Sequence, residues 1–372
     1  MTDLYLPDLA SRELGGGVVA ANDELFAERE NLIKPEAPVF QPHTFGPKGQ
    51  IMDGWETRRR RERGPDSHDH AIVRLGCPGV VRTVVVDTAF FRGNFPPETS
   101  VEACGVEGHP SPGELAAADW TTLVARCALT GDSAHEFAVE DEHRYTHVRL
   151  SIYPDGGVAR LRVFGEVVPD PRLLAHTIDL AALENGGRVL DCSNSFFSSP
   201  NNLIKPGLAL VMGDGWETSR RRDDGNDWVQ VQLACAGRTV LAEIDTTHFV
   251  GNAPGWAALT GEGVDVLART ALQPDTRHRF VLAPAELSAV RLDVFPDGGV
   301  GRLRLYGTPT EAGRASLTRQ FLNRVPDSQL AGLLDSAGLS GDDADRLAAG
   351  RPYADLAELP GSLRARLAGA GT

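Results

Sequence analysis

The sequence contains one set of motifs twice in the same order, and this duplication constrains the fold more than any other feature. The repeated motifs, with the first residue of each copy, are "NLIKP" at Asn31 and Asn202, "DGWET" at Asp53 and Asp214, "DTAFFRGN" or "DTTHFVGN" at Asp87 and Asp245, and "YPDGGVARLRVFG" or "FPDGGVGRLRLYG" at Tyr153 and Phe295. The first copy carries segments that the second lacks, the longest of them between Asn94 and Gly131. A chain written this way is expected to fold as two similar domains.

Short apolar stretches typical of β-strands fill both copies. They are "HAIVRLG", "VRTVVVDT", "HVRLSIYP" and "ARLRVFG" in the first, and "WVQVQLA", "RTVLAEIDT", "AVRLDVFP" and "GRLRLYG" in the second. "PDGG" between two such stretches predicts a hairpin turn, because glycine supplies the positive φ that these turns need. Many short strands without intervening helices indicate an all-β fold of two tandem β-sandwiches or jelly rolls, at residues 15–170 and 180–307.

The rest of the chain narrows the class of protein. Residues 315–372 are rich in Ala, Leu and Arg with breaks at Gly and Pro, which predicts a short helical C-terminal tail. The net charge of −14 repels nucleic acid and anionic membranes, and no stretch is apolar enough to span a bilayer. The N-terminus lacks a signal-peptide pattern, and the 5 scattered cysteines never form a CxxC pair. Together these features favour a cytoplasmic protein.

The "DGWET" motif has a structural and a functional interpretation. Asp-Gly forms a turn and the tryptophan anchors it in the core, which accounts for Trp55 and Trp216. The carboxylates of Asp53 and Glu56, which flank Trp55, are instead suited to a ligand rich in N–H groups. Both interpretations stay open at this point.

Each "DGWET" is followed by arginines, within residues 58–63 in the first copy and at residues 220–222 in the second. A guanidinium suits bidentate binding of a carboxylate. If the run is extended, Arg58 and Arg60 point to one face, so only some of the arginines can serve. A solvated strand end explains the run equally well.

Polar residues also follow the apolar strands. Asp87 and Asn94, with Asp245 and Asn252 in the second copy, would face a ligand at the rim of a sheet. The alternative is that they only hydrogen-bond their own loops.

Two histidines belong to the first copy alone. His68 and His70 would share a face of a strand, with Asp69 between them, and could form a general base or bind a metal. The second copy has Trp228 opposite His70, and His248 opposite Phe90.

Together, "NLIKP", "DGWETRRRR", "DTAFFRGNFPPETSVEAC", "DGWETSRRR", "DTTHFVGNAP" and the paired "PDGGxxRLRxxG" resemble the allantoicase (allantoate amidinohydrolase) family over roughly residues 15–307. The resemblance implies tandem jelly rolls of the galactose-binding type that form homo-oligomers. It also implies hydrolysis of allantoate to ureidoglycolate and urea in purine (allantoin) degradation. Some members use a divalent metal such as Mn²⁺, and the motifs leave that choice open. The tail is similar to the N-terminal helices of ureidoimidazoline decarboxylases, without their catalytic section.

For this substrate, arginine would bind the carboxylate, and Asp, Glu and Asn would bind the ureido groups. We expect the chemistry chiefly in the first copy, with the second contributing shape. The catalytic candidates are His68, Asp69, His70, Glu56 and Glu102, and the substrate-binding candidates are Asp53, Arg58, Arg60, Asp87, Asn94, Arg220 and His248. The alternative hypothesis is a non-catalytic duplicated jelly-roll module that binds a carbohydrate or another small polar ligand.

Overall fold

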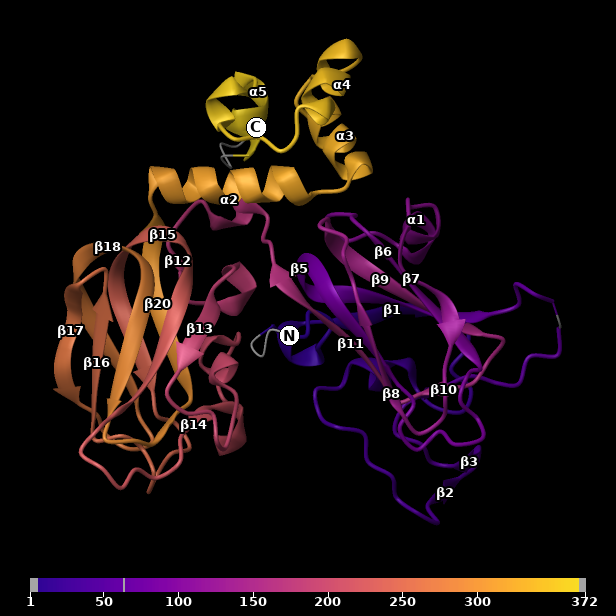
Figure 1. Cartoon of the computed structure of the whole chain (residues 1–372), viewed down its shortest axis with the longest axis horizontal. Helices are drawn as coiled ribbons and strands as arrows, with labels where there is room; N and C mark the ends of the chain where they lie inside the picture. The colour runs from indigo at the N-terminus through magenta and orange to yellow at the C-terminus, as the bar shows by residue number, and fades with distance from the viewer. Residues whose placement is uncertain (1–5, 63, 368–372) are drawn as a thin grey trace. The chain divides into compact units, whose positions relative to one another are not determined.

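The computed structural model describes residues 6–62 and 64–367. Arg63, the last arginine of the first run, lies outside this part of the chain, as do the final residues of the tail. The described chain divides into two compact units, residues 6–167 with 324–348, and residues 168–323 with 349–367. Each unit contains one β-rich repeat (Figure 1), which confirms the predicted fold of two tandem jelly rolls with a helical tail.

The first repeat forms a 7-stranded antiparallel sheet in the order β1-β5-β9-β6-β7, with β11 and β8 also paired to β5. Its strands are β1 (Gly17–Ala21), β5 (Asp69–Asp87), β6 (Glu98–Cys104), β7 (Thr121–Ala128), β8 (Ala134–Ala138), β9 (Arg144–Tyr153) and β11 (Arg160–Val167). Two short pairs, β2 (Phe45–Gly46) with β3 (Gly49–Gln50) and β4 (Trp55–Glu56) with β10 (Gly157–Val158), lie at its rim, and α1 (Pro112–Ala116) lies in the long insertion.

The second repeat has the same plan. Its 7-stranded sheet runs in the order β12-β20-β15-β18-β16-β17, with β13 paired to β15, and β14 pairs with β19. The strands are β12 (Ile178–Asp179), β13 (Arg188–Cys192), β14 (Trp216–Glu217), β15 (Asp227–Asp245), β16 (Trp256–Gly261), β17 (Val264–Ala271), β18 (Arg277–Phe295), β19 (Gly299–Val300) and β20 (Arg302–Pro309). The β2–β3 hairpin has no counterpart within the described second repeat.

One strand in each repeat is long enough to serve both layers of its sandwich. In β5, residues 71–74 pair with β1, whereas residues 79–87 pair with β11. The strand bends between these parts, where strands commonly change layer. Gly79 is required at the bend, because a Cβ atom there would lie 2.1 Å from the carbonyl oxygen of Glu166. In β15 the pairing with β18 shifts register just before Gly237, so both repeats use the same device.

The tryptophans of "DGWET" anchor the rim of each sandwich. Trp55 and Trp216 are both 0% exposed. The indole N–H of each donates to a backbone carbonyl 2.8 Å away, that of Asp23 or of Asn194. The structural interpretation of the tryptophans is therefore confirmed, and it holds for both copies.

"NLIKP" braces the same turn. The side-chain amide of Asn31 donates to the carbonyl of Gly54 at 2.9 Å, and Asn202 donates to Gly215 at 2.9 Å. The Leu-Ile pairs that follow are completely buried in both copies. The repeated motifs are thus neighbours in space, and each supports the next.

The prediction that "PDGG" forms a hairpin was wrong. The strands on either side of it, β9 and β11, pair with β5 rather than with each other. The second glycine is needed instead for packing, because a Cβ atom on Gly157 would lie 2.0 Å from the ring of Phe91, and one on Gly299 would lie 1.9 Å from Phe249. The stretch therefore closes over a buried phenylalanine and leads into β10, which pairs with β4.

The C-terminal segment is helical, as predicted. It contains α2 (Glu311–Arg324), α3 (Asp327–Ser336), α4 (Asp342–Ala349) and α5 (Gly361–Leu367). The start of α2 packs on the second repeat, where a Cβ on Gly313 would meet the carbonyl of Ala236 at 2.1 Å. In the other unit, the side-chain amide of Gln329 in α3 donates to Glu107 at 2.6 Å. The tail is thus divided between the two units.

We predict that Trp55→Ala lowers the free energy of unfolding by about 3–5 kcal/mol, the usual cost of removing a buried tryptophan. Trp256→Ala is the matched control, since Trp256 is 45% exposed, and it should change stability little. Urea denaturation followed by circular dichroism measures both variants. Equal midpoints for Trp55→Ala and wild type would contradict the anchoring role.

Candidate active site

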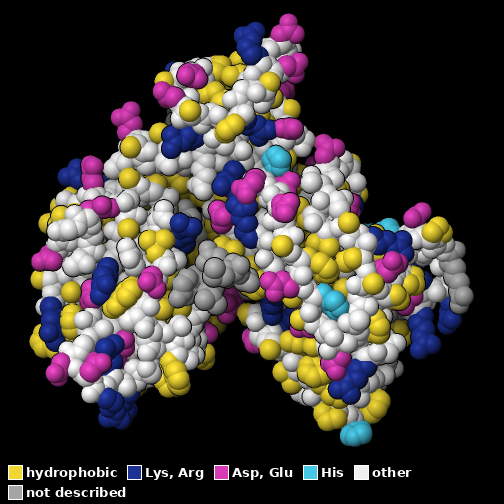
Figure 2. Space-filling model, in the orientation of Figure 1, with side chains coloured by type: hydrophobic (Ala, Val, Ile, Leu, Met, Phe, Trp, Pro, Cys, Tyr) yellow, Lys and Arg dark blue, Asp and Glu magenta, His cyan; other side chains and the backbone are white. Residues whose placement is uncertain are grey.

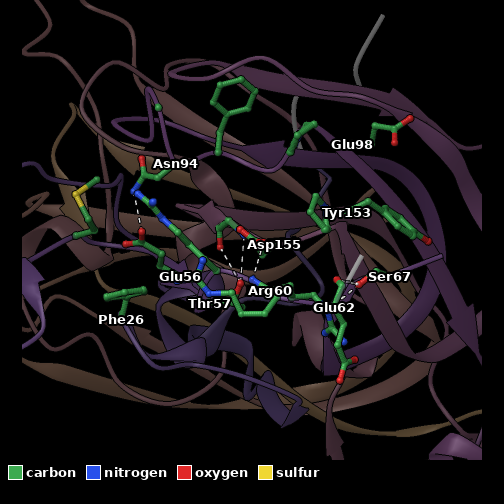
Figure 3. A pocket seen from close by; sticks show the side chains of 18 of the residues that line it. Phe26, Glu56, Thr57, Arg60, Glu62, Ser67, Asn94, Glu98, Tyr153 and Asp155 are labelled. Carbon is green, nitrogen blue, oxygen red and sulfur yellow. Dashed lines mark hydrogen bonds between the residues drawn. The ribbon is translucent and has the colours of Figure 1, made fainter. Parts of the chain in front are cut away.

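A cavity of about 1030 Å³ opens beside β4 in the first repeat. Three repeated motifs line it, through Glu56 of "DGWET", Asn94 of "RGN" and Asp155 of "PDGG". Glu56 and Asn94 lie at one end, and Tyr153 and Glu98 lie at the other (Figure 3). Its size suits a small-molecule ligand.

Glu56 is the acidic group best placed for chemistry. It is half-buried, and its Oε1 accepts a hydrogen bond of 2.8 Å from the side-chain amide of Asn94. Asn94 is itself held in place, because its backbone carbonyl accepts from the N–H of Gly157 at 2.8 Å. Burial raises the pKa of Glu56, and the hydrogen bond from Asn94 partly offsets that rise. A carboxyl group with a raised pKa can donate and accept a proton closer to neutral pH.

Cations line the same cavity as Glu56. Lys48, Arg59 and Arg61 line the cavity, and no hydrogen bond or ion pair joins them to another described residue. On the visible face of the molecule, acidic and basic side chains are interspersed (Figure 2). Because the net charge of the chain is −14, unpaired cations in one cavity favour a small anionic ligand locally.

Arg60 also borders the cavity but serves the fold. Its guanidinium pairs with Asp69, donates to the carbonyl of His68 at 2.8 Å, and donates to Ser67 at 3.0 Å. The side chain of Asp69 is only 3% exposed, and Asn22 donates to it at 2.8 Å. Arg221 and Asp227 repeat this ion pair at 2.8 Å in the second repeat.

Three other predicted ligand-binding residues have partners within the fold. Asp53 pairs with Arg160 at 2.7 Å and Lys34 at 3.1 Å. Arg58 pairs with Asp23, outside the lining of the cavity. Asp87 accepts from the N–H two residues ahead at 2.8 Å, the local bond of the structural alternative. Their roles in binding stay predictions.

His68, His70 and Glu102 do not line the cavity that contains Glu56. The ring centroids of the two histidines are 5.8 Å apart. His68 lines a smaller cavity of about 330 Å³ that shares Arg60 with the first. Burial, aided by the nearby charges of His68 and Arg149, lowers the pKa of His70. Glu102 is ion-paired with Arg149 at 2.7 Å. Their catalytic roles stay predictions.

The described residues contain no group of three or more His, Cys, Asp or Glu side chains placed to hold a metal ion. The donor set near Glu56 is therefore a poor match for Mn²⁺, which prefers several oxygen ligands. We assign no step to a metal.

The two predicted substrate-binding residues of the second repeat, Arg220 and His248, differ in whether they have a partner within the fold. Arg220 is exposed and unpaired within the part of the chain that the structure describes. His248 has a positive φ of 73°, and its Nε2 lies 3.0 Å from the carbonyl of Ala209. Arg220 is thus available to a ligand, whereas His248 contacts the loop that follows the second "NLIKP".

Sequence analysis missed one group of cavity residues. The guanidinium of Arg126 lies 4.0 Å from the centre of the Tyr153 ring, and its Nε donates to Glu98 at 3.0 Å. A difference between the two copies could have pointed to these residues. The first repeat pairs Glu98 with Tyr153, and the equivalent pair in the second repeat is Trp256 with Phe295.

Comparisons with known proteins agree with this architecture. The family model for the allantoicase repeat matches residues 7–168 and 178–310. The chain belongs to the allantoicase family. It is 54% identical over 332 residues to a probable allantoicase of Streptomyces avermitilis, covering 84% of this chain and 88% of that protein. A probable allantoicase of Nocardia farcinica is 56% identical over 311 residues, with 81% and 94% covered.

The family also includes solved structures. The crystal structure of allantoicase from Saccharomyces cerevisiae matches with a TM-score of 0.71 at 36% identity, covering 81% of this chain and 92% of that chain. Both repeats thus belong to the allantoicase family, whereas α2 begins where the family match ends. None of the described helices is long and apolar enough to cross a bilayer.

We predict that Arg60→Ala destabilises the protein by about 3–5 kcal/mol, because it leaves the buried Asp69 carboxylate without its cation. Arg59→Ala is the matched control, since Arg59 is exposed and unpaired, and it should leave stability within about 0.5 kcal/mol of wild type. Thermal unfolding of both variants measures the difference. Equal losses in both would refute the structural role of Arg60.

Proposed function

We propose that this protein hydrolyses allantoate to ureidoglycolate and urea, and that the cavity of the first repeat carries the reaction. The observation that carries this proposal is the half-buried Glu56, hydrogen-bonded by Asn94, beside unpaired arginines. Membership of the allantoicase family supplies the substrate. No specific observation favours a non-catalytic binding module.

The cavity suits both parts of allantoate, a carboxylate and two ureido arms on one carbon. Arg59 and Arg61 would bind the carboxylate, since guanidinium groups match its geometry. The amide oxygen of Asn94 would accept an N–H group of one ureido arm, and the protonated free oxygen of Glu56 would donate to the nitrogen of that arm. The chain thereby places its acid next to the nitrogen that must leave.

The reaction exchanges a C–N bond for a C–O bond. Glu56, in its protonated form, gives its proton to the nitrogen of the departing ureido arm, which leaves as urea. The lone pair of the remaining ureido nitrogen stabilises the positive charge that develops on the central carbon. Water adds to that carbon and returns a proton to the Glu56 carboxylate, which gives ureidoglycolate.

We also propose that the protein acts in the cytoplasm as a homo-oligomer. None of the five cysteines, all within the described chain, forms a disulfide, which suits a reducing compartment. Self-association rests on the resemblance to the family, and sedimentation velocity of the purified chain tests it.

Urea release from allantoate tests the proposed activity. We expect wild-type protein to release urea, with or without added Mn²⁺, and Glu56→Gln to lower kcat by at least about a hundredfold. Glu217→Gln, at the equivalent position of the second repeat, is the matched control and should keep nearly full activity. If Glu56→Gln keeps full activity and Glu217→Gln is inactive, the reaction belongs to the second repeat and our assignment to the first is wrong. No urea from the wild type under either condition would reject the activity.

The pH dependence of kcat tests the role of Glu56 as the acid. Because the protonated carboxyl is the active form, kcat should fall as the pH rises through its pKa. The hydrogen bond from Asn94 lowers that pKa, so Asn94→Ala should raise it and move the fall to higher pH. Asn252→Ala, the equivalent change in the second repeat, should leave the profile unchanged. A shift to lower pH in Asn94→Ala would contradict the assignment.

A further inference from the structure

The second repeat has the same hydrogen bonds around Glu217 that hold Glu56 in the first repeat. The side-chain amide of Asn252 donates to Glu217 at 2.6 Å, as Asn94 donates to Glu56 at 2.8 Å. The backbone carbonyl of Asn252 accepts from the N–H of Gly299 at 2.8 Å, which matches the bond between Asn94 and Gly157. Both the carboxylate–amide hydrogen bond and the backbone hydrogen bond that holds the asparagine are thus present in each repeat.

The cations are copied as well. Arg220 and Arg222 occupy the positions of Arg59 and Arg61, and both are exposed without an ion pair to another described residue. The intervening Arg221 is fixed, because its N–H donates to Asp297 at 2.8 Å and its guanidinium pairs with Asp227. A structural role would need only the fixed arginine, so it does not account for the two free ones.

The surroundings differ in polarity. The first cavity has Glu98 and Tyr153 at one end, where the second repeat has Trp256 and Phe295. Met212 contacts the Asn252 amide at 3.3 Å and is 44% exposed. The second repeat keeps groups for one ureido arm and a carboxylate, but aromatic rings that stack on Arg269 stand where the first repeat has a carboxylate and a phenol hydroxyl.

We propose that the second repeat binds a small carboxylate that carries one ureido group, at Glu217, Asn252 and Arg220, and does not hydrolyse it. Glu217 and the amide oxygen of Asn252 accept the ureido N–H groups, and Arg220 binds the carboxylate. The choice of ligand class rests on the proposed function. The site is separate from the reaction in the first repeat.

N-carbamoylglycine is the probe, because it has one ureido arm and a carboxylate. It lacks the second nitrogen on the central carbon, whose lone pair would help urea to leave, so it stays intact. Isothermal titration calorimetry of the full chain should find two molecules bound per chain. Asn252→Ala should bind one molecule, and Asn94→Ala should lose the other.

Arg220→Ala is the second variant, chosen because an exposed and unpaired side chain can be removed without unfolding the repeat. It should weaken one of the two binding events by at least about tenfold. Binding that is unchanged in both Asn252→Ala and Arg220→Ala, or a wild type that binds no probe, would overturn the proposal.

The urea assay separates this proposal from the activity. If wild-type protein releases no urea but Asn252→Ala still loses a bound probe molecule, the proposed activity fails and the second site stands. If urea is released and probe binding is unchanged in both variants of the second repeat, only the second site fails.

Discussion

The burial of one indole determines where the carboxyl group of Glu56, the proposed acid, can lie. Trp55 and Glu56 make up the whole of β4, and successive side chains of a strand point to opposite faces. Because Trp55 is completely buried and hydrogen-bonded to the carbonyl of Asp23, Glu56 must face the rim. Pairing of β4 with β10 then brings "PDGG" alongside. Trp55 therefore meets the structural interpretation of "DGWET", and the functional interpretation is a proposal for Glu56 alone.

The arginines follow a similar division. Arg60 neutralises a carboxylate that the fold has buried, and Arg160, which is 1% exposed, ties Asp53 to the rim. Arg58 is paired with Asp23, so that among the described arginines of the run Arg59 and Arg61 are left to meet a ligand. A guanidinium that is already paired with a buried carboxylate cannot bind a substrate without leaving that carboxylate uncompensated, which is costly. Arginines that the fold needs to neutralise buried carboxylates are thus excluded from ligand binding, and the others remain for it.

Much of the fold could be predicted from the sequence, because repeated motifs and apolar periodicity report directly on burial. The tandem jelly rolls, the buried tryptophans and the helical tail were predicted. The conformation of "PDGG" was not predicted, because its second glycine, Gly157, is required by the ring of Phe91, a residue far away in the sequence. The cavity was only partly predicted for the same reason. Motif spacing gave Glu56 and Asn94, whereas Arg126 and Tyr153 meet through strand pairing that motif spacing does not report.

Because the chain is duplicated, its two copies show which residues are kept and which differ. The residues that hold the turns are the same in both copies, whereas several residues at the rim differ. The residues that hold the turns make mutually dependent contacts, in which the asparagine of "NLIKP" braces the turn before the tryptophan and the glycine of "PDGG" fits the phenylalanine ring. Replacing one of these residues would remove contacts that its partners need, so both copies keep them. Residues at the rim, such as Glu98 and its counterpart Trp256, differ between the two copies. A duplicated protein can therefore alter what one repeat binds without disturbing how either repeat folds.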